Sequence, residues 1–197
     1  MTLKKIERDL YLQENVVSVA RQLIGKVLYS MIDGELTAGI ITETEAYAGE
    51  KDRASHAFGG KRTSRNAPMY GIGGYSYVYL CYGIHHLFNI VTNMPGIPHA
   101  VLVRGIHPIV GLDVMAERRS PAKPTTAGPG TLTQAMGIRT IHTALDLCGD
   151  LIWLEDHGIK VKDEDVTVGP RIGVDYAGAD ALLPYRFLVR PSQLKIP

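Results

Sequence analysis

The chain has 197 residues, of which 45% are hydrophobic and 21% are charged, and its formal net charge is +1. No apolar run approaches the ~20 residues of a membrane span, and the only cysteines are Cys81 and Cys148, which argues against membrane-spanning and disulfide-rich classes. We expect one domain over residues 1–197, and near-neutrality neither demands nor excludes nucleic acid, because a neutral chain can carry a basic face.

Apolar spacing and turn residues predict the first elements of the chain. Residues 12–23 carry apolar side chains at helical spacing and are followed by Gly25, so they predict a helix with a left-handed cap. Residues 26–32 and 35–47 predict two strands, because Asp33–Gly34 between them is a strong hairpin signal.

A long loop and a second hairpin are predicted next. Residues 48–74 contain several glycines and no clear period, which indicates a surface loop. A loop of that length in a compact domain is usually functional or disordered, and its basic residues favour function. Residues 75–82 and 85–92 predict two strands around the turn glycine Gly83.

The remaining elements complete a mixed fold. They are a strand at 100–106, a helix from Pro108 to Arg119, a linker at 120–129, a helix at 132–136, and strands at 151–155, 166–174 and 185–190. Because strands outnumber helices and tight turns join many of them, we predict an α+β fold. It would be a single compact domain with a curved, mostly antiparallel sheet, flanking helices and a protruding β-hairpin.

Glu43, Glu45 and Tyr47 project from one face of the strand at 35–47, because side chains alternate along a strand. Acidic residues in such a place can simply form a solvated strand face. A catalytic carboxylate instead needs a partly buried position lined by polar groups. Glu45, which is flanked by Ala46 and Tyr47, is the better catalytic candidate.

His56 and Arg104 are two further candidates. A loop histidine is often only a hydrogen-bonding residue, and the seven histidines lack ligand-like clustering, so we expect no metal. Arg104 interrupts an apolar strand, and a buried arginine must be paired. It can form a structural salt bridge, orient a carboxylate such as Glu45, or do both.

The tyrosines of residues 75–82 fall into two groups. Tyr75, Tyr77 and Tyr79 share a face, and aromatic strand residues normally belong to a core. Tyr82 is out of phase with them and stands beside Gly83. A side chain at such a turn can act as a wedge between stacked bases.

The strongest signal is the order of motifs along nearly the whole chain. They are TETEAY at 42–47, SH at 55–56, GGKRTSRN at 59–66, Met69, YVYLCYG at 77–83, Asn89, LVRGIHP at 102–108, GPG at 128–130, LTQAMGI at 132–138 and RIGV at 171–174. With these motifs the chain resembles the alkyladenine (3-methyladenine) DNA glycosylase family. It departs from the family pattern at Thr131, where a lysine is frequent, and at His85, where an aromatic residue is common.

The resemblance implies a role for each matching residue. Glu45 would activate a water molecule and Arg104 would help to hold it, while Tyr82 would enter the minor groove of DNA. The walls of the base pocket would be formed by Tyr47, Ala54, His56, Tyr79, Asn89 and Val174. Contacts to the DNA backbone would come from Lys61, Arg62, Thr63, Arg65 and Met69.

The activity that the resemblance implies is that of a monofunctional DNA glycosylase in base excision repair. It would flip an alkylated or deaminated purine out of double-stranded DNA and hydrolyse the N-glycosidic bond, leaving an abasic site. We expect a monomer without cofactor or membrane contact. Because MTLKKIERDLYLQ lacks the apolar core of a signal peptide, we expect a cytoplasmic, nucleoid-associated protein in a bacterium and a nuclear one in a eukaryote. The residues alone leave one alternative open, a non-enzymatic nucleic-acid-binding module that uses the same sheet and basic loop.

Overall fold

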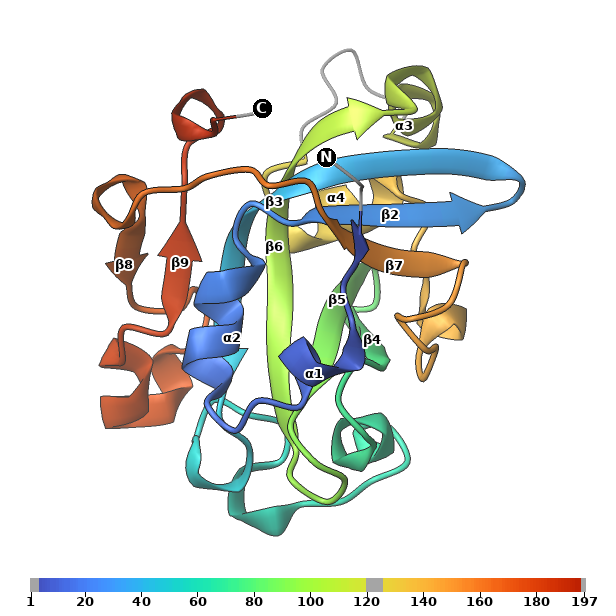
Figure 1. Cartoon of the computed structure of the whole chain (residues 1–197). Helices are drawn as coiled ribbons and strands as arrows, with labels where there is room; N and C mark the ends of the chain where they lie inside the picture. Colours follow the sequence, from blue (N-terminus) through green and yellow to red (C-terminus); the bar gives the residue numbers. More distant parts are fainter. Residues whose placement is uncertain (1–3, 120–125, 196–197) are drawn as a thin grey trace.

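The β-prone segments of the chain come together in one curved sheet (Figure 1). The computed structural model describes residues 4–119 and 126–195, and within these ranges nine strands are joined by antiparallel pairing. The order along the sheet is β1-β7-β2-β3-β6-β5-β4, and β9 pairs with both β3 and β8. The α+β prediction with a mostly antiparallel sheet is therefore confirmed.

The elements alternate irregularly between strands and short helices. The strands are β1 Lys4–Lys5, β2 Val27–Ile32, β3 Glu35–Tyr47, β4 Ser76–Cys81, β5 His85–Thr92, β6 His99–Val110, β7 Ile152–Asp156, β8 Thr167–Gly169 and β9 Arg186–Leu188. The α-helices are α1 Arg8–Tyr11, α2 Val16–Leu23, α3 Leu112–Arg119 and α4 Pro129–Ala135. Short 3₁₀ helices cover Gly49–Lys51, Phe58–Gly60, Ala67–Tyr70, Thr140–His142, Asp163–Asp165, Asp175–Leu182 and Pro191–Gln193.

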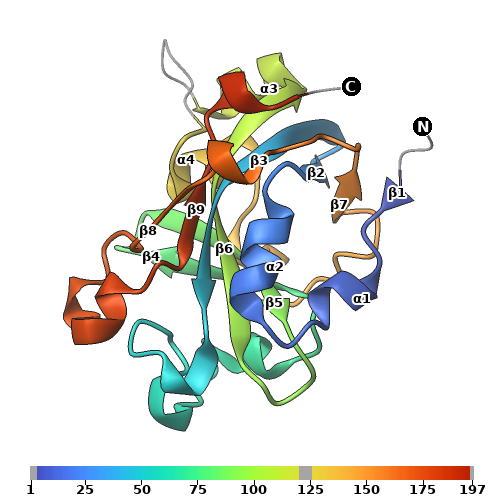
Figure 2. The same ribbon diagram turned by 60° about the vertical axis from the view of Figure 1, so that its left-hand side comes forward.

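The long strand β3 organises the sheet. Its first half pairs with β2 through the predicted two-residue turn, in which Asp33 and Gly34 have φ angles of 57° and 81°. Positive φ at both central residues matches the twist of the flanking strands and favours the Asp-Gly pair. Its second half pairs with β9 at Glu43–Glu45, and β6 pairs along its other edge (Figure 2).

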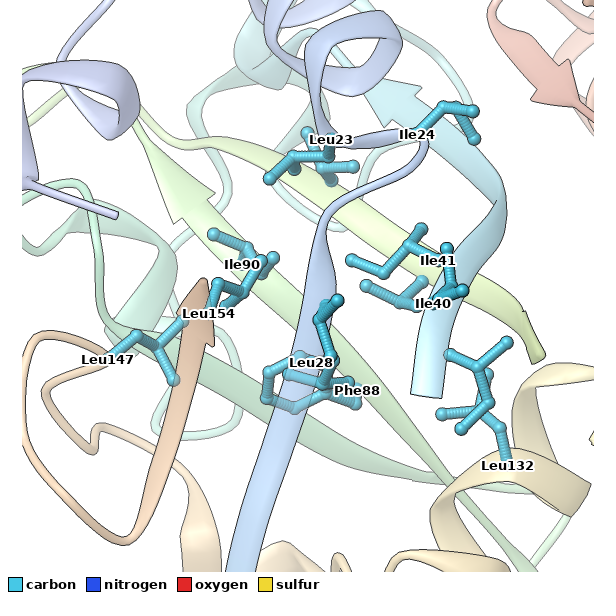
Figure 3. Packing of buried hydrophobic residues seen from close by; sticks show 14 of the residues in the cluster. Leu23, Ile24, Leu28, Ile40, Ile41, Phe88, Ile90, Leu132, Leu147 and Leu154 are labelled. Atoms are coloured by element: carbon cyan, nitrogen blue, oxygen red, sulfur yellow. The ribbon is translucent and has the colours of Figure 1, made fainter. Parts of the chain in front are cut away.

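The two faces of the sheet have different roles. On β5, Phe88 and Ile90 are fully buried in the main hydrophobic cluster, whereas Leu87 and Asn89 face a cavity on the other side. This is the two-residue alternation of a strand. The same cluster takes in Leu23 from α2 and Leu132 from α4 (Figure 3). One face therefore builds the core, and the opposite face is left to line the cavity.

The first predicted helix begins later than expected. Residues 12–23 do not form one helix, because α2 begins only at Val16, where the side chain of Asn15 accepts hydrogen bonds from the Val17 and Ser18 amides. A side-chain cap of this kind sets a helix start more strongly than apolar spacing. Gly25 has the expected positive φ, but it follows the extended residue Ile24.

Pro108 does not begin a helix. Strand β6 continues through it to Val110, and α3 begins at Leu112 after Gly111, which has a φ of +70°. Pro108 lies opposite Gly39 at a register shift between β3 and β6. A proline is tolerated in a strand at such an irregularity, because its missing N–H interrupts no regular ladder there.

Three other predictions need correction or lie partly outside the described residues. The strand expected at 166–174 spans only Thr167–Gly169, and the rest is irregular. The segment 48–74 is not simply a surface loop, because it contains three short 3₁₀ helices and buried residues such as Asn66 and Met69. Residues 120–125 of the predicted linker lie outside the described ranges. No described helix has the length and apolar character needed to cross a membrane.

Candidate active site

A cavity of about 810 Å³ opens on the face of the sheet that the core does not use. Its walls come from β3 to β6, from residues 172–176 and from the start of α4. The aromatic side chains in its wall are Tyr47, His56, Tyr77, Tyr79, Tyr82, His85 and Tyr176. A concave site lined by aromatic rings and few polar groups suits a flat organic ligand.

Glu45 lies fully buried directly behind this wall, with 0% of its surface exposed. One carboxylate oxygen accepts a hydrogen bond from the Tyr47 hydroxyl at 2.9 Å, and the other accepts one from the Ile172 amide at 2.8 Å. Tyr47 and Ile172 both line the cavity. Because a carboxylate oxygen can accept more than one hydrogen bond, Glu45 keeps acceptor capacity for a further donor such as water.

The second acidic residue of the same strand face has a different role. Glu43 accepts hydrogen bonds from the Nε atoms of Arg104 at 3.0 Å and Arg186 at 2.6 Å. The Arg104 Nε also lies 3.4 Å from a Glu45 oxygen, and Arg104 lines the cavity. Glu43 and Glu45 are both buried, so they do not form a solvated strand face. Glu43 is a structural partner that holds Arg104 beside Glu45.

The environment raises the pKa of the Glu45 carboxyl above its ordinary value. Burial is the largest cause, and the Arg104 guanidinium, the Ile172 amide and the Tyr47 hydroxyl oppose it by favouring the charged form. A buried carboxylate stripped of water is a stronger base than a solvated one. This combination suits a group that takes up a proton during a reaction.

His56 and Tyr79 form one aromatic part of the cavity wall. Their ring centroids are 4.6 Å apart and the planes meet at 69°, an edge-to-face arrangement. Nδ1 of His56 lies 2.9 Å from the Tyr77 hydroxyl. The pKa of His56 is lowered, chiefly by burial and further by the positive charges of Arg65 and Lys61. Burial raises the pKa of Tyr77 to about 12. The His56 imidazole and the Tyr77 phenol are therefore uncharged at neutral pH, which leaves the π-faces of these two rings available for a cationic ligand.

Tyr82 stands at the tip of the hairpin that joins β4 and β5. It is 89% exposed and has a φ of +51°, and the next residue, Gly83, has a φ of +74°. Cys81 and His85 form the last pair of the ladder. The side chain therefore projects beyond the sheet at the cavity mouth, and Tyr82 does not belong to the core.

The basic segment lies against this hairpin. Arg65 donates a hydrogen bond to the Leu80 carbonyl at 2.9 Å, and its guanidinium lies over the Tyr79 ring at 5.2 Å. The Arg62 guanidinium lies over the Tyr70 ring at 4.0 Å. Lys61, Arg62, Thr63 and Arg65 are all exposed, and the three basic residues among them present positive charge close to the cavity.

The other predicted site residues lie at the cavity in different ways. Ala54, Asn89, Val174 and Met69 all line it. The Ala54 carbonyl accepts a hydrogen bond from the Tyr176 hydroxyl at 3.3 Å. The Asn89 side-chain amide donates to the Tyr77 and Leu87 carbonyls. Met69 is only 2% exposed and its N–H donates to the Asn66 carbonyl, so its side chain belongs to the cavity wall rather than to the exposed basic surface.

The two departures from the family pattern lie next to each other at the cavity. The Thr131 hydroxyl donates to the Gly128 carbonyl at 2.8 Å. The His85 ring lies so close to Gly130 that a Cβ atom at Gly130 would be 2.8 Å from it. Gly130 is therefore the residue that lets the start of α4 approach the hairpin.

Sequence reasoning missed the residues that hold the back of this site. Asp52 and Arg171 form a buried ion pair, and Ile172 supplies the amide that contacts Glu45. Arg171 and Ile172 belong to the RIGV motif, but only Val174 of that motif had a predicted role. Nothing in the spacing of single Asp and Arg residues 119 positions apart could have paired them. Among residues 4–119 and 126–195, no group of three or more His, Cys, Asp or Glu side chains is placed to hold a metal ion.

Comparison with known proteins agrees with the site. The model of the family described as "Methylpurine-DNA glycosylase (MPG)" matches residues 10–193. A protein of Chlamydia felis named "Putative 3-methyladenine DNA glycosylase" is 41% identical over 194 residues, covering 96% of this chain and 98% of that protein. Relatives with the same name from Myxococcus xanthus and Desulfitobacterium hafniense are 45% identical over 175 residues and 38% identical over 201 residues. They cover 89% and 97% of this chain, and 85% and 98% of their own lengths, respectively. The chain therefore belongs to the methylpurine-DNA glycosylase family, whose members are DNA-repair hydrolases that cleave N-glycosyl bonds.

Proposed function

We propose that this protein removes alkylated or deaminated purines from double-stranded DNA by hydrolysis, after flipping the damaged nucleotide into the aromatic cavity. The observation that carries the proposal is the buried Glu45 carboxylate, held directly behind a cavity whose mouth is flanked by the exposed Tyr82. A target base inside a duplex cannot be reached without extrusion, so a pocket and a wedge are needed together. A protein that only bound DNA would have no use for a buried basic carboxylate beside its pocket.

The reaction we propose uses water as the nucleophile. Glu45 takes a proton from the water, the water oxygen bonds to C1′ of the sugar, and the bond from C1′ to the purine nitrogen breaks. The electron pair of that bond goes to the departing base, which neutralises the positive charge of an alkylated purine, whereas a neutral lesion such as hypoxanthine takes up a proton from solvent as it leaves. Such a base is a good leaving group, and the products are free base and an abasic site, with no covalent enzyme intermediate and no strand cleavage.

Selectivity for damaged bases would come from the aromatic walls. An alkylated purine is cationic and electron-poor, and a tyrosine face attracts a cation through its quadrupole. The neutral rings of Tyr47, His56 and Tyr79 supply such faces. The backbone N–H of His56 has no hydrogen-bond partner within the described part of the chain, so it can donate to the edge of a bound base. Asn89 would act as a steric filter against the exocyclic amine of guanine.

The test is release of free base by the purified protein from duplexes that each contain one 7-methylguanine, hypoxanthine or ethenoadenine, at one salt concentration. We expect free base from at least one duplex, with the strand left intact until alkali cleaves the abasic site. Tight binding of these duplexes without any base release would contradict hydrolysis. Release accompanied by strand cleavage without alkali would contradict the monofunctional reaction. We further propose that a monomer in the cytoplasm carries out this reaction.

Replacing Lys61, Arg62 and Arg65 by Ala is expected to flatten the salt dependence of duplex binding. Each phosphate contact adds about 0.9 to the slope of log affinity against log salt concentration. The expected slope change is therefore between about 1 and 3, measured by fluorescence anisotropy over a series of salt concentrations.

The matched control removes the same charge from exposed residues that do not line the cavity, Lys160, Lys162 and Lys195. It should leave the salt slope close to that of the wild type. An unchanged slope in the Lys61, Arg62 and Arg65 variant would mean that this segment does not contact the phosphates. Because Arg65 also binds the Leu80 carbonyl, a Lys61 and Arg62 double variant separates charge from hairpin support.

A further inference from the structure

The buried ion pair between Asp52 and Arg171 lies behind the cavity wall and is not used by the chemistry above. Arg171 Nη1 and Nη2 donate to the two Asp52 oxygens at 2.5 and 2.8 Å, and the side chains are 0% and 2% exposed. Neither residue lines the cavity. A bidentate pair of this kind fixes both orientation and distance, which a single contact does not.

Arg171 also contacts strand β3, which carries Glu45 and Tyr47. Its Nη1 donates to the Ala46 carbonyl at 2.9 Å, and Ala46 stands between Glu45 and Tyr47. Its guanidinium lies over the Tyr47 ring at 4.8 Å. Since Tyr47 lines the cavity and Arg171 does not, Arg171 covers the face of this ring that is turned away from the cavity.

The residue after Arg171 completes the connection. The Ile172 amide donates to Glu45 at 2.8 Å, so a shift of the Arg171 backbone would move a direct hydrogen-bond donor of the carboxylate. Asp52 anchors the other side, because its oxygens also accept hydrogen bonds from the amides of Ala48 and Ala54, both at 3.0 Å. The pair thus ties together the end of β3, the loop that follows it and the segment that begins at Arg171.

We propose that Asp52 and Arg171 are positioning residues for the hydrolysis, acting through the Ile172 amide on Glu45 and through the ring of Tyr47. The proposal rests on the proposed function, because it assigns the pair a part in that same site. Its two consequences are a Tyr47 ring held at one angle for stacking and a Glu45 carboxylate held in one rotamer. A misplacement of about 1 Å in such a group can cost ~10²-fold in rate.

The pair should also affect the proton affinity of Glu45. The groups that face this carboxylate are the Arg104 guanidinium, the Glu43 carboxylate, the Tyr47 hydroxyl and the Ile172 amide. The amide favours the charged form, and so does the Arg171 cation. Loss of Arg171 would weaken both contributions, so the pKa of Glu45 should rise. The excision rate would then begin to fall at a higher pH as the solution is acidified.

The experiment compares Arg171→Gln, Asp52→Asn and the double variant with the wild type in single-turnover excision at saturating enzyme, as a function of pH. The duplex carries one hypoxanthine, or whichever lesion the wild type excises best. We expect each single variant to lose about 10- to 100-fold in rate, with the acidic limb of its pH profile moved upward. The double variant should be little slower than either single one, because partners in one contact are not additive.

A matched control is available in Arg8. Arg8 donates to both oxygens of Asp146 at 2.6 and 2.7 Å and lies over the Tyr75 ring at 5.4 Å, but it does not line the cavity. Arg8→Gln should keep the wild-type rate and pH profile. If it slows excision as much as Arg171→Gln does at an equal loss of melting temperature, the Asp52–Arg171 effect is general destabilisation and the proposal is overturned.

Conservative variants and an NMR titration test the same two residues where a variant does not fold or where turnover is not measurable. Arg171→Lys keeps the charge but cannot form the two parallel hydrogen bonds to Asp52, and Asp52→Glu keeps a carboxylate. Either variant replaces the Gln or Asn variant in the excision assay where that variant is unfolded. A folded Arg171 variant with wild-type rate and pH profile would overturn the proposal. NMR titration of the Glu45 carboxyl does not need turnover: an unchanged pKa in Arg171→Gln would overturn the positioning role. Absence of base release by the wild type would instead overturn the proposed function alone.

Discussion

Replacing Glu45 by Gln should lower the rate of base excision by ~10²-fold or more, as expected for removal of a general base, while binding of lesion DNA is retained. Glutamine has nearly the same shape, so its amide oxygen can accept from the Ile172 amide while its NH2 group donates to the Tyr47 hydroxyl, and these two groups contact the two carboxylate oxygens in the wild type. What the variant loses is the ability to take a proton from water. The measurements are single-turnover release of free base and equilibrium binding of the same duplex.

The matched control for this variant is Glu155→Gln. Glu155 is a partly buried carboxylate on β7 that accepts one hydrogen bond from the Trp153 indole and lies 2.9 Å from His157 Nε2, and it does not line the cavity. Its replacement should leave excision unchanged. Excision at a near wild-type rate by folded Glu45→Gln protein would remove Glu45 from the reaction and leave the cavity without an identified base.

The pH dependence gives a second readout of Glu45. Only the ionised carboxylate can accept the proton, so the rate should fall as the pH drops through the pKa of this group. Burial raises that pKa above its ordinary value, which places the fall at a higher pH than a solvated glutamate would give. The remaining slow reaction of Glu45→Gln should lack this acidic limb, because its side chain does not titrate.

Local patterns were enough to predict much of the sheet and the shared strand face of two candidate site residues. Alternation along β3 placed Glu45 and Tyr47 on one face, and the structure joins them by a hydrogen bond. The Asp33–Gly34 signal fixed the register of the first hairpin, because only certain residues adopt positive φ at both turn positions. These features depend on residues that are close together in the sequence, so they can be predicted before the fold is known.

The missed features depend on contacts between distant segments. Pro108 looked like a helix start, but the pairing of β6 with β3 overrode its local preference. Arg171 and Asp52 are 119 positions apart and carry no spacing signal, yet they hold the back of the cavity. Ile172 acts through its backbone amide, which every residue except proline possesses. A role of this kind is visible only once the fold brings the chain segments together.

The other large effect is expected at the hairpin tip, where Tyr82→Ser should weaken binding of lesion duplexes by about tenfold or more while folding stays nearly intact. Flipping a nucleotide costs a few kcal/mol of unstacking, and an inserted ring offsets part of it by stacking in the vacated space. A stacked aromatic side chain is worth about 1–3 kcal/mol by truncation. Because Tyr82 is 89% exposed, its truncation should change the free energy of unfolding by less than about 0.5 kcal/mol.

Tyr82→Phe is the matched control, since it keeps the ring and loses only the hydroxyl, and it should bind lesion duplexes nearly as tightly as the wild type. A single-stranded oligonucleotide with the same lesion provides the second comparison. It contains no base stack to refill, so Tyr82→Ser should weaken its binding much less than that of the duplex. Equal losses on both substrates would indicate a surface contact rather than a wedge. A large fall in melting temperature with unchanged duplex affinity would place the contribution of Tyr82 in the hairpin itself, whose tip holds this residue at a φ of +51°.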